Sequence, residues 1–227
     1  MVCTNKSDCP GKNNGAGSPS WITAVLHSFS SAKAAVDLGM NDNVLEHLTK
    51  VFWPEGDSLT GNQVYWLLDG AQDPEIADLL RRGGLEFTCL FEGNLHPRLR
   101  AAAPYLVHLS AGSSTTELLL RKGWGKAWGI LTIARPEITL TQQRLHFKKL
   151  LRVQTEDGEV FGFRFYDPRV LREYLPTCKS DEIKTLFGPV TRLLAESHDG
   201  SIVHAFKQGS QGLGVRDHPV AGLRTRP

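Results

Sequence analysis

A strand and a helix meet within nine residues of this sequence, at positions 163–171 (FRFYDPRVL). Phenylalanines occupy every second position on the way into this corner: Phe161, Phe163 and Phe165. Because side chains alternate between the two faces of a strand, this spacing predicts three aromatic rings on one face of a sheet. Asp167 suits the N-cap of a helix and Pro168 suits its first position, where a missing amide hydrogen costs nothing. The chain must therefore fold into an architecture that contains both strands and helices.

Strand-like and helix-like segments alternate over most of the chain. The strand-like segments of the first half are Val64–Leu68, Leu85–Phe91, Pro104–Leu109 and Trp128–Ile133. In the second half, Asp157-Gly158 and Asp199-Gly200 each separate two strand-like runs, and this dipeptide is typical of tight hairpin turns. Strands separated by helices favour parallel pairing. We therefore expect an α/β fold with a mixed sheet, parallel in its first half, with hairpins in its second half, and covered by helices.

Two further helix starts can be recognised from capping residues. Asp73 and Pro74 repeat the aspartate-proline chemistry of the corner and predict a helix soon after the first strand. Thr139 and Gln142 have the spacing of a capping box, which predicts another helix.

The helix that follows Thr139 has a basic side. Its basic residues lie next to the apolar ones and are Arg144, Lys148, Lys149 and Arg152. No acidic residue occurs between Ile138 and Thr155, so the sequence predicts that these charges are unopposed. Such a face is usually solvated, but it could also meet an acidic patch on another protein.

Composition and cysteine spacing exclude several classes of partner. The 227 residues carry 26 basic and 24 acidic side chains, a net charge of +2, so we expect no broad electropositive surface for nucleic acid. The four cysteines contain no Cys-x-x-Cys pair, which argues against a zinc site, and we expect no cofactor. An export signal and a run of about 20 apolar residues are both missing. The sequence thus predicts a cytoplasmic protein without membrane insertion.

One folded domain between two tails is the expected organisation. Residues 1–20 are rich in Gly, Asn, Ser and Lys and predict a disordered tail. Residues 21–207 are expected to form a single α/β domain, in which 168–207 could be a smaller C-terminal lobe. Residues 208–227 carry glycines and several arginines, and we expect a flexible basic tail there.

One segment could carry hydrolase chemistry. Ser110 stands between a predicted strand and a predicted helix in the run 108–112 (HLSAG), which is the context of a nucleophile elbow. His108 occupies the place of the first glycine of Gly-x-Ser-x-Gly, where its side chain would crowd the turn. A base could come from another histidine: His146, His198 or His204. A small α/β serine hydrolase using Ser110 is the alternative function; the simpler interpretation is a serine-rich loop that caps the next helix.

Two other motifs have structural explanations. Asp69 ends a predicted strand, a place where carboxylates can be catalytic, but beside Gly70 it more often makes a turn. The glycine-rich run 123–129 follows a helix and precedes a strand, which reverses the order that binds a pyrophosphate. Its glycines are expected to end a helix and to let Trp124 and Trp128 pack.

Several separated blocks, taken in order, resemble the type VI secretion adaptor family. They are Tyr65–Ala71 followed by Asp73–Glu75, Ala103–Val107, Trp128–Ile130, His146–Leu151, Phe163–Leu171 and Phe187–Pro189. The similarity spans 64–190, a little over half of the chain. Proteins of that family, also called effector chaperones, are typically encoded between a valine-glycine-repeat (VgrG) spike protein and a toxin.

The resemblance implies a non-enzymatic cytoplasmic protein that binds a toxic effector and loads it onto the C-terminal region of a VgrG spike. Its partners would be that spike and a cognate secreted effector, with no nucleic acid and no cofactor. The shared blocks would mainly build the scaffold, through these residues: Asp69, Asp73, Pro74, Trp128, Asp167 and Pro168.

Aromatic and basic side chains are the expected contacts of such a protein, because these residue types anchor protein interfaces. The corner arginines and the basic helix side suggest most of them. The candidates for protein binding are Trp53, Trp124, Arg144, Lys148, Arg164 and Arg169.

Overall fold

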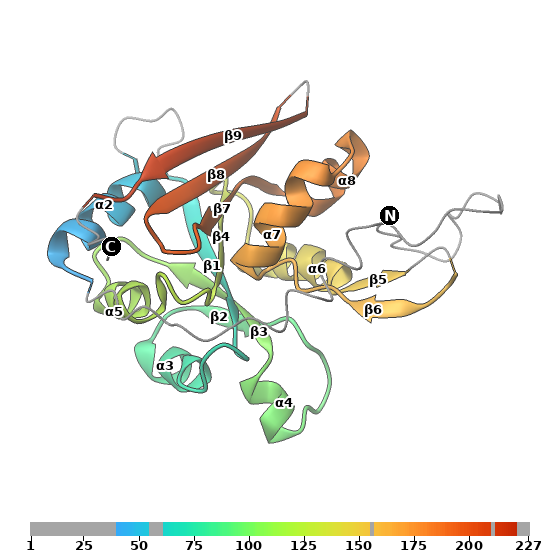
Figure 1. The fold of residues 1–227 in the computed structure, drawn as a ribbon. Helices are drawn as coiled ribbons and strands as arrows, with labels where there is room; N and C mark the ends of the chain where they lie inside the picture. Colours follow the sequence, from blue (N-terminus) through green and yellow to red (C-terminus); the bar gives the residue numbers. More distant parts are fainter. Residues whose placement is uncertain (1–39, 55–60, 155–156, 210–211, 222–227) are drawn as a thin grey trace.

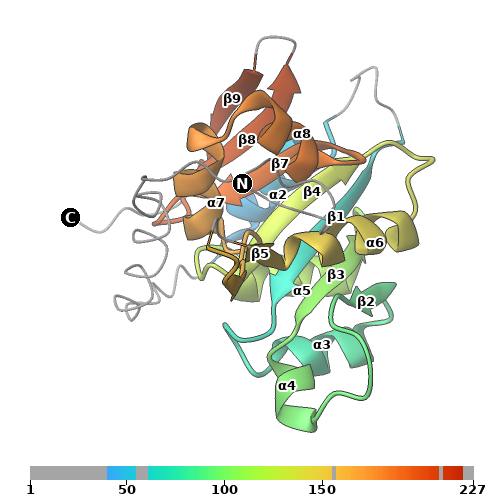
Figure 2. The same ribbon diagram turned by 90° about the vertical axis from the view of Figure 1, so that its right-hand side faces the viewer.

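The computed structural model describes residues 40–54, 61–154, 157–209 and 212–221, so the predicted N-terminal tail lies outside the described residues. A seven-stranded sheet with the order β2-β3-β1-β4-β7-β8-β9 runs through the middle of the molecule (Figure 1, Figure 2). Its strands are β1 (Gln63–Asp69), β2 (Phe87–Cys89), β3 (Pro104–Leu109), β4 (Gly129–Ala134), β7 (Val190–Glu196), β8 (Ile202–Gly209) and β9 (Gly212–Pro219).

The central strand β1 is buried on both faces, as its apolar run predicts. Val64, Trp66 and Leu68 join the core on one side of the sheet, and Tyr65 and Leu67 join the core on the other side. This alternation follows from the two-residue period of a strand. The sheet therefore separates two hydrophobic cores, and each core needs its own layer of helices.

Helices cover both faces of the sheet. The helices α2 (Asp42–Phe52), α3 (Ile76–Gly83) and α5 (Ser114–Gly123) pack on the face of Trp66. The helices α6 (Leu140–Leu150), α7 (Pro168–Tyr174) and α8 (Ser180–Phe187) pack on the face of Tyr65, nearer the viewer in Figure 2. The short α4 (Pro97–Ala101) leads into β3, and a 3₁₀ turn, Leu175–Thr177, follows α7.

The prediction of a parallel first half is wrong, because every strand pair of the sheet is antiparallel. The α3 crossover does leave β1 and β2 running in the same direction, and the α5 crossover does the same for β3 and β4. However, β3 lies between β1 and β2, and β1 lies between β3 and β4. A strand-helix-strand pattern sets the direction of successive strands without making them neighbours, and here an antiparallel strand fills each space.

The first predicted hairpin is present but forms a separate small sheet. Strands β5 (Arg152–Gln154) and β6 (Val160–Gly162) pair antiparallel and extend away from the main sheet at the right of Figure 1. The strand ends before Phe163, which is buried together with Phe165, whereas Phe161 is 37% exposed. The prediction of three rings on one sheet face is therefore wrong for Phe161.

The second predicted hairpin, β7–β8, is also present, with Gly200 in the left-handed conformation at its turn. Strand β7 pairs with β4 in the main sheet, so 168–207 do not form a separate lobe. The prediction of a flexible tail over 208–227 is wrong for Gly212–Pro219, which form β9 and pair with β8. The folded unit thus extends to the last described residues.

The two aspartate-proline corners differ in detail. Asp167 is the N-cap of α7, its carboxylate accepts a hydrogen bond from the amide of Arg169 at 2.9 Å, and Pro168 is the first helical residue. Asp73 accepts from the amide of Glu75 at 2.8 Å, but α3 begins only at Ile76, so Pro74 lies in the preceding turn rather than in the helix.

Trp128 depends on a glycine at the end of α5. A Cβ placed on Gly123 would lie 2.4 Å from Cε3 of Trp128, so any side chain there would displace the indole ring. Trp128 is 2% exposed in the core on the α5 side. The predicted role of these glycines in tryptophan packing is confirmed at this position.

Candidate functional site

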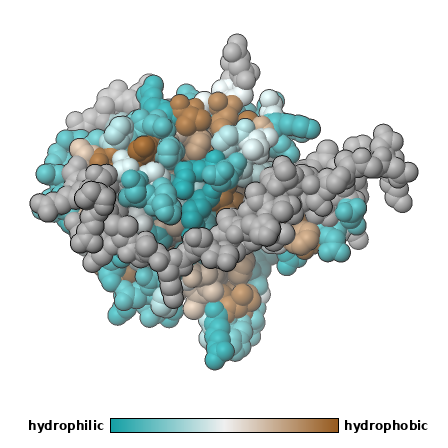
Figure 3. All heavy atoms as spheres, in the orientation of Figure 1, coloured by the Kyte–Doolittle hydropathy of each residue, from teal (hydrophilic) through white to brown (hydrophobic). Residues whose placement is uncertain are grey.

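A groove of about 1070 Å³ opens where the end of β1 meets α4, α6 and the β5–β6 hairpin. The C-terminal turn of α6 and the hairpin form one side of the groove, and α4 with the loop that precedes it forms the other. In Figure 1 these elements surround the lower right part of the molecule. Figure 3 shows apolar atoms at the surface over α4 and, separately, over the hairpin. The groove brings together parts of the chain that are far apart in sequence.

A buried ion pair lies at the base of the groove. Asp69 is the last residue of β1 and lies on the same strand face as Tyr65 and Leu67, so its carboxylate points toward the segment that follows the hairpin. It is 1% exposed and accepts hydrogen bonds from the guanidinium of Arg164, from the amide of Ala71 at 3.1 Å and from the side-chain amide of Gln72 at 2.9 Å.

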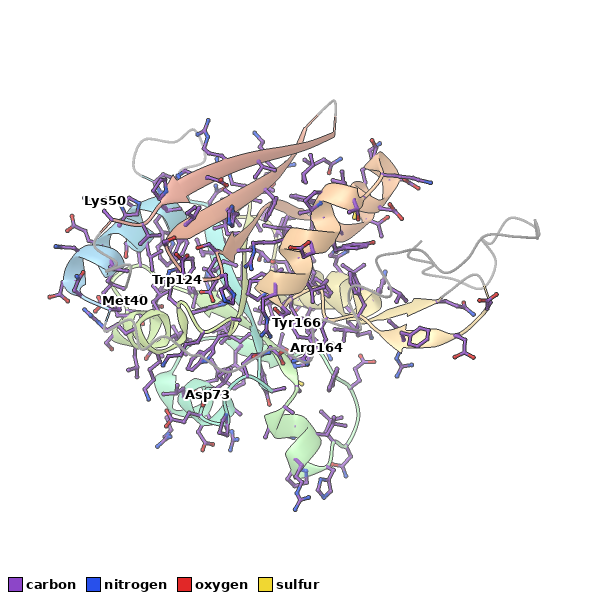
Figure 4. The ribbon with its side chains drawn as sticks, in the orientation of Figure 1. Met40, Lys50, Asp73, Trp124, Arg164 and Tyr166 are labelled. Carbon is purple, nitrogen blue, oxygen red and sulfur yellow. The ribbon has the colours of Figure 1, made fainter. Side chains whose placement is uncertain are left out.

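The charge of Asp69 affects its neighbours. Burial lowers the pKa of Arg164, but the charge and the hydrogen bond of Asp69 outweigh it and raise that pKa above its ordinary value. Burial and the same carboxylate raise the pKa of Tyr166, so its phenol stays neutral. Figure 4 shows Arg164 and Tyr166 close together at this place. The arginine therefore stays protonated, and Asp69 acts here as its structural counter-ion.

A second pair fixes the helix that leaves the corner. Arg169 donates to both carboxylate oxygens of Asp167, from Nε at 2.9 Å and from Nη2 at 2.6 Å. The same carboxylate caps α7, so one aspartate orients both the helix start and the arginine. Arg169 does not line the groove, because its guanidinium is held on the helix side of the corner.

Two of the four basic residues, Arg144 and Lys148, are opposed in the folded chain, so the prediction of unopposed charges is wrong for this pair. Glu92, in the loop before α4, lies 2.6 Å from Nζ of Lys148 and 3.6 Å from Nη2 of Arg144. Arg144 also donates from Nε to the carbonyl of Cys89 at 2.9 Å. The sequence around α6 contains no acid, and only the packing of the loop before α4 against this helix supplies one.

Of the six candidates for protein binding, the structure brings Lys148 and Arg164 into the groove, with Arg144 beside them through Glu92. Trp53 lies at the end of α2, half-buried against Phe52, away from this site. The prediction that Trp124 is a surface anchor is wrong, because its ring is 2% exposed and its Nε1 donates to the carbonyl of Gly200 at 2.9 Å. Figure 4 places Trp124 apart from Arg164.

Sequence reasoning missed the apolar part of the groove. Leu99 of α4 and Val160 and Phe161 of β6 are 48%, 60% and 37% exposed, and all three line it. Val160 and Phe161 follow the Asp-Gly turn of a short hairpin. Apolar residues on such a hairpin were a signal in the sequence that could have indicated exposed apolar side chains. Such a sheet has too few strands to bury both of its faces.

The arrangement around Ser110 does not resemble a nucleophile elbow. Ser110 is exposed after β3, its amide donates to the hydroxyl of Thr116 at 3.2 Å, and within the described ranges its own hydroxyl has no histidine partner. His108 instead stacks on Tyr65 at 4.8 Å between ring centroids. His146 contacts the carbonyl of Leu186 at 3.2 Å. His204 pairs with Asp217 at 2.8 Å, so neither imidazole is directed at the serine.

Two general properties complete the picture of the site. Among the residues that the structure describes, no group of three or more His, Cys, Asp or Glu side chains could hold a metal ion. In the same part of the chain, the helices are too short or too polar to cross a bilayer.

Comparison with known proteins gives one family. The model of the family described as "Domain of unknown function (DUF4123)" matches residues 64–185, which is more than half of the 227 residues and includes all of β1 except Gln63, the groove and the α7 corner. No curated protein and no solved structure matches the chain. The chain therefore belongs to the DUF4123 family.

Proposed function

We propose that this protein is a type VI secretion adaptor that binds a toxic effector and loads it onto the C-terminal region of a VgrG spike protein. The observation that carries the binding role is the groove, in which exposed apolar side chains and basic side chains meet on a fixed scaffold. The resemblance of the sequence blocks to effector chaperones supplies the identity of the partners. In this proposal the protein acts in the cytoplasm, by binding alone, without a covalent step or a cofactor.

The chemistry of the groove suits a reversible protein interface. Interfaces gain most of their affinity from a few buried apolar or aromatic anchors, and polar rims add specificity. Phe161 and Leu99 can serve as such anchors, while Lys148 and Arg164 supply positive charge beside them. The ion pairs with Glu92 and Asp69 hold these cations in place before any partner arrives, which lowers the entropy lost on binding.

Affinity purification from the native cell, followed by mass spectrometry, tests the proposal. We expect a VgrG spike and a secreted toxin to be recovered with the tagged full-length chain. Deleting the gene should abolish export of that toxin while other secreted proteins of the system are still exported. Recovery of neither partner, or unchanged export of every toxin, would refute the adaptor role.

Charge reversal tests whether α6 takes part. The variant Arg144→Glu with Lys148→Glu should weaken recovery of one partner, because Lys148 lines the groove and Arg144 lies beside it, next to Glu92. Lys207→Glu is a matched control, since Lys207 is an exposed lysine of β8 outside the groove. Equal recovery with both variants would remove α6 from the binding site.

A further inference from the structure

We infer that the groove recognises one extended segment of a protein partner, which adds as a strand to the free edge of β6 and carries large apolar side chains next to carboxylates. This inference rests on the proposed function and specifies the partner chemistry of its site. Three independent features of the groove support it: the distribution of exposed apolar side chains, the strand edge and the unpaired charges.

Exposed apolar side chains concentrate in this groove. In the described ranges, six large hydrophobic residues are exposed: Leu99, Leu118, Leu145, Val160, Phe161 and Val215. Three of them, from two different elements, line the one groove, whereas the other three lie on separate elements. Below them the lining continues with buried Leu90 and Phe163. A segment placed here would bury apolar surface on two sides, which is the main source of affinity in an interface core.

Strand β6 borders the groove with residues from both of its faces. Val160 and Gly162 lie on one face of the strand and Phe161 lies on the other, and all three line the groove. Among the described strands β6 pairs only with β5, so its second edge has backbone groups that can pair with an added strand.

The open space at Gly162 supports the same geometry. A Cβ placed on Gly162 would meet no heavy atom within 4 Å. The face of β6 at Gly162 is therefore open, so side chains of an added strand would meet no obstacle there.

The charges at the border select for carboxylates. The groove is lined by four basic side chains and two acidic ones, a surplus of two positive charges. Asp69 holds Arg164 and Glu92 holds Lys148, whereas Lys149 and Arg152 have no ion pair in the described part of the chain. Carboxylates of a bound segment can pair with these two cations, and a basic segment would be repelled.

Photo-crosslinking of the full-length chain in its cellular complex tests the inference directly. Benzoylphenylalanine would replace Phe161 in one variant and Val215, which is exposed on β9, in a control variant. After irradiation we expect a crosslink from position 161 to one short segment of a partner protein, with large apolar residues and at least one Asp or Glu. Position 215 should give no crosslink to that segment.

Two further measurements examine the strand pairing and the charges. Hydrogen exchange of the complex should show slower exchange of the amides of Val160 and Gly162 than in the free chain, because these two amides lie on the free edge of β6. The amide of Phe163 is the internal reference, since it already donates to the carbonyl of Leu151 in the hairpin. The variant Lys149→Glu with Arg152→Glu should weaken binding by about tenfold or more, whereas Lys207→Glu should leave it within about twofold.

Each outcome distinguishes this inference from the proposed function. If the wild-type chain recovers neither effector nor spike, the adaptor role and the groove both fail. If the complex forms but position 161 gives no crosslink, crosslinks a second copy or another part of the same chain, or crosslinks a segment without carboxylates, only the groove inference is overturned. Unchanged exchange at Val160 and Gly162 in a formed complex would overturn the strand addition.

Discussion

The ion pair between Asp69 and Arg164 should be a major determinant of stability, and a double-mutant cycle can measure its contribution. The variants are Asp69→Ala, Arg164→Ala and the double variant. Because the carboxylate is 1% exposed, removal of either partner leaves groups whose hydrogen bonds water cannot fully replace. We therefore expect two large single effects and a double effect that is far from their sum.

The magnitude follows from burial and hydrogen bonding. Breaking a buried pair costs about 3–5 kcal/mol, and the side chain of Arg164 is 30% exposed, so it can partly regain solvent. For Asp69→Ala we expect a loss of about 3 kcal/mol, which includes the amide of Ala71 that loses its acceptor. For Arg164→Ala we expect roughly 2–3 kcal/mol, because a buried carboxylate keeps only neutral donors. The coupling energy should be about 2 kcal/mol.

Urea unfolding followed by tryptophan fluorescence gives the four free energies of unfolding. The exposed pair of Lys122 and Glu75, at 2.5 Å with side chains 41% and 59% exposed, is the control cycle, and we expect its coupling to be much smaller than that of Asp69 and Arg164 because solvent screens both charges. The interpretation that this ion pair fixes the segment 163–171 to the end of β1 would be refuted by either of two results. One is that the losses in the free energy of unfolding for the Asp69 and Arg164 variants are additive, and the other is that their coupling is no larger than in the control.

Three other measurements follow from the structure. Burial raises the pKa of Glu196 to about 7, although hydrogen bonds from the amides of Gly125 and Ala127 and the charge of Arg172 act in the opposite direction. The raised pKa means that the folded state binds the proton more tightly than the unfolded state does. The free energy of unfolding should therefore fall by roughly 3 kcal/mol as pH rises from about 4.5 to about 7. Urea unfolding of Glu196→Gln should lack this decline, and an equal pH slope in variant and wild type would contradict the assignment. Gly129→Ala should lower the free energy of unfolding by about 3 kcal/mol, because the new Cβ would lie 2.0 Å from the carbonyl oxygen of Leu67. The control Gly162→Ala, which places its Cβ in open space, should cost below about 1 kcal/mol in the same thermal or urea unfolding. Similar losses for the two variants would show that β1 and β4 can move apart. Thr139→Ala should cost about 1 kcal/mol by removing the cap of α6, measured in the same way, and no loss would mean that water replaces the hydroxyl.

Local features of the fold could be predicted because their causes lie within a few residues. The burial of β1 follows from an apolar run, the α7 corner from Asp167 and Pro168, and the start of α6 from the Thr139–Gln142 capping box. Both Asp-Gly dipeptides give the hairpins they predict. In each case a side chain or a backbone angle acts on its own neighbourhood, so the rest of the chain need not be known.

The candidate site could be predicted only in part. The sequence singled out Lys148 and Arg164 as surface cations, and both line the groove. It could not provide Glu92 as the partner of Lys148, because the two residues lie 56 positions apart and meet only when the loop before α4 packs near α6. The sequence indicated that Trp124 packs beside the glycines of 123–129, but it could not provide the partner of its indole, because Gly200 is 76 positions away.

The sequence by itself determined the caps of α6 and α7, the two Asp-Gly turns and the apolar run of β1, and its match over 64–185 determined family membership. Only the tertiary structure decided which strands became neighbours, so that β1 entered between β3 and β4 and made the whole sheet antiparallel. It also decided that β9 closes the fold and that α4, α6 and the hairpin enclose one groove. The physical reason is that capping and turn formation depend on short-range contacts, whereas strand order and surface shape depend on how distant apolar faces share two cores.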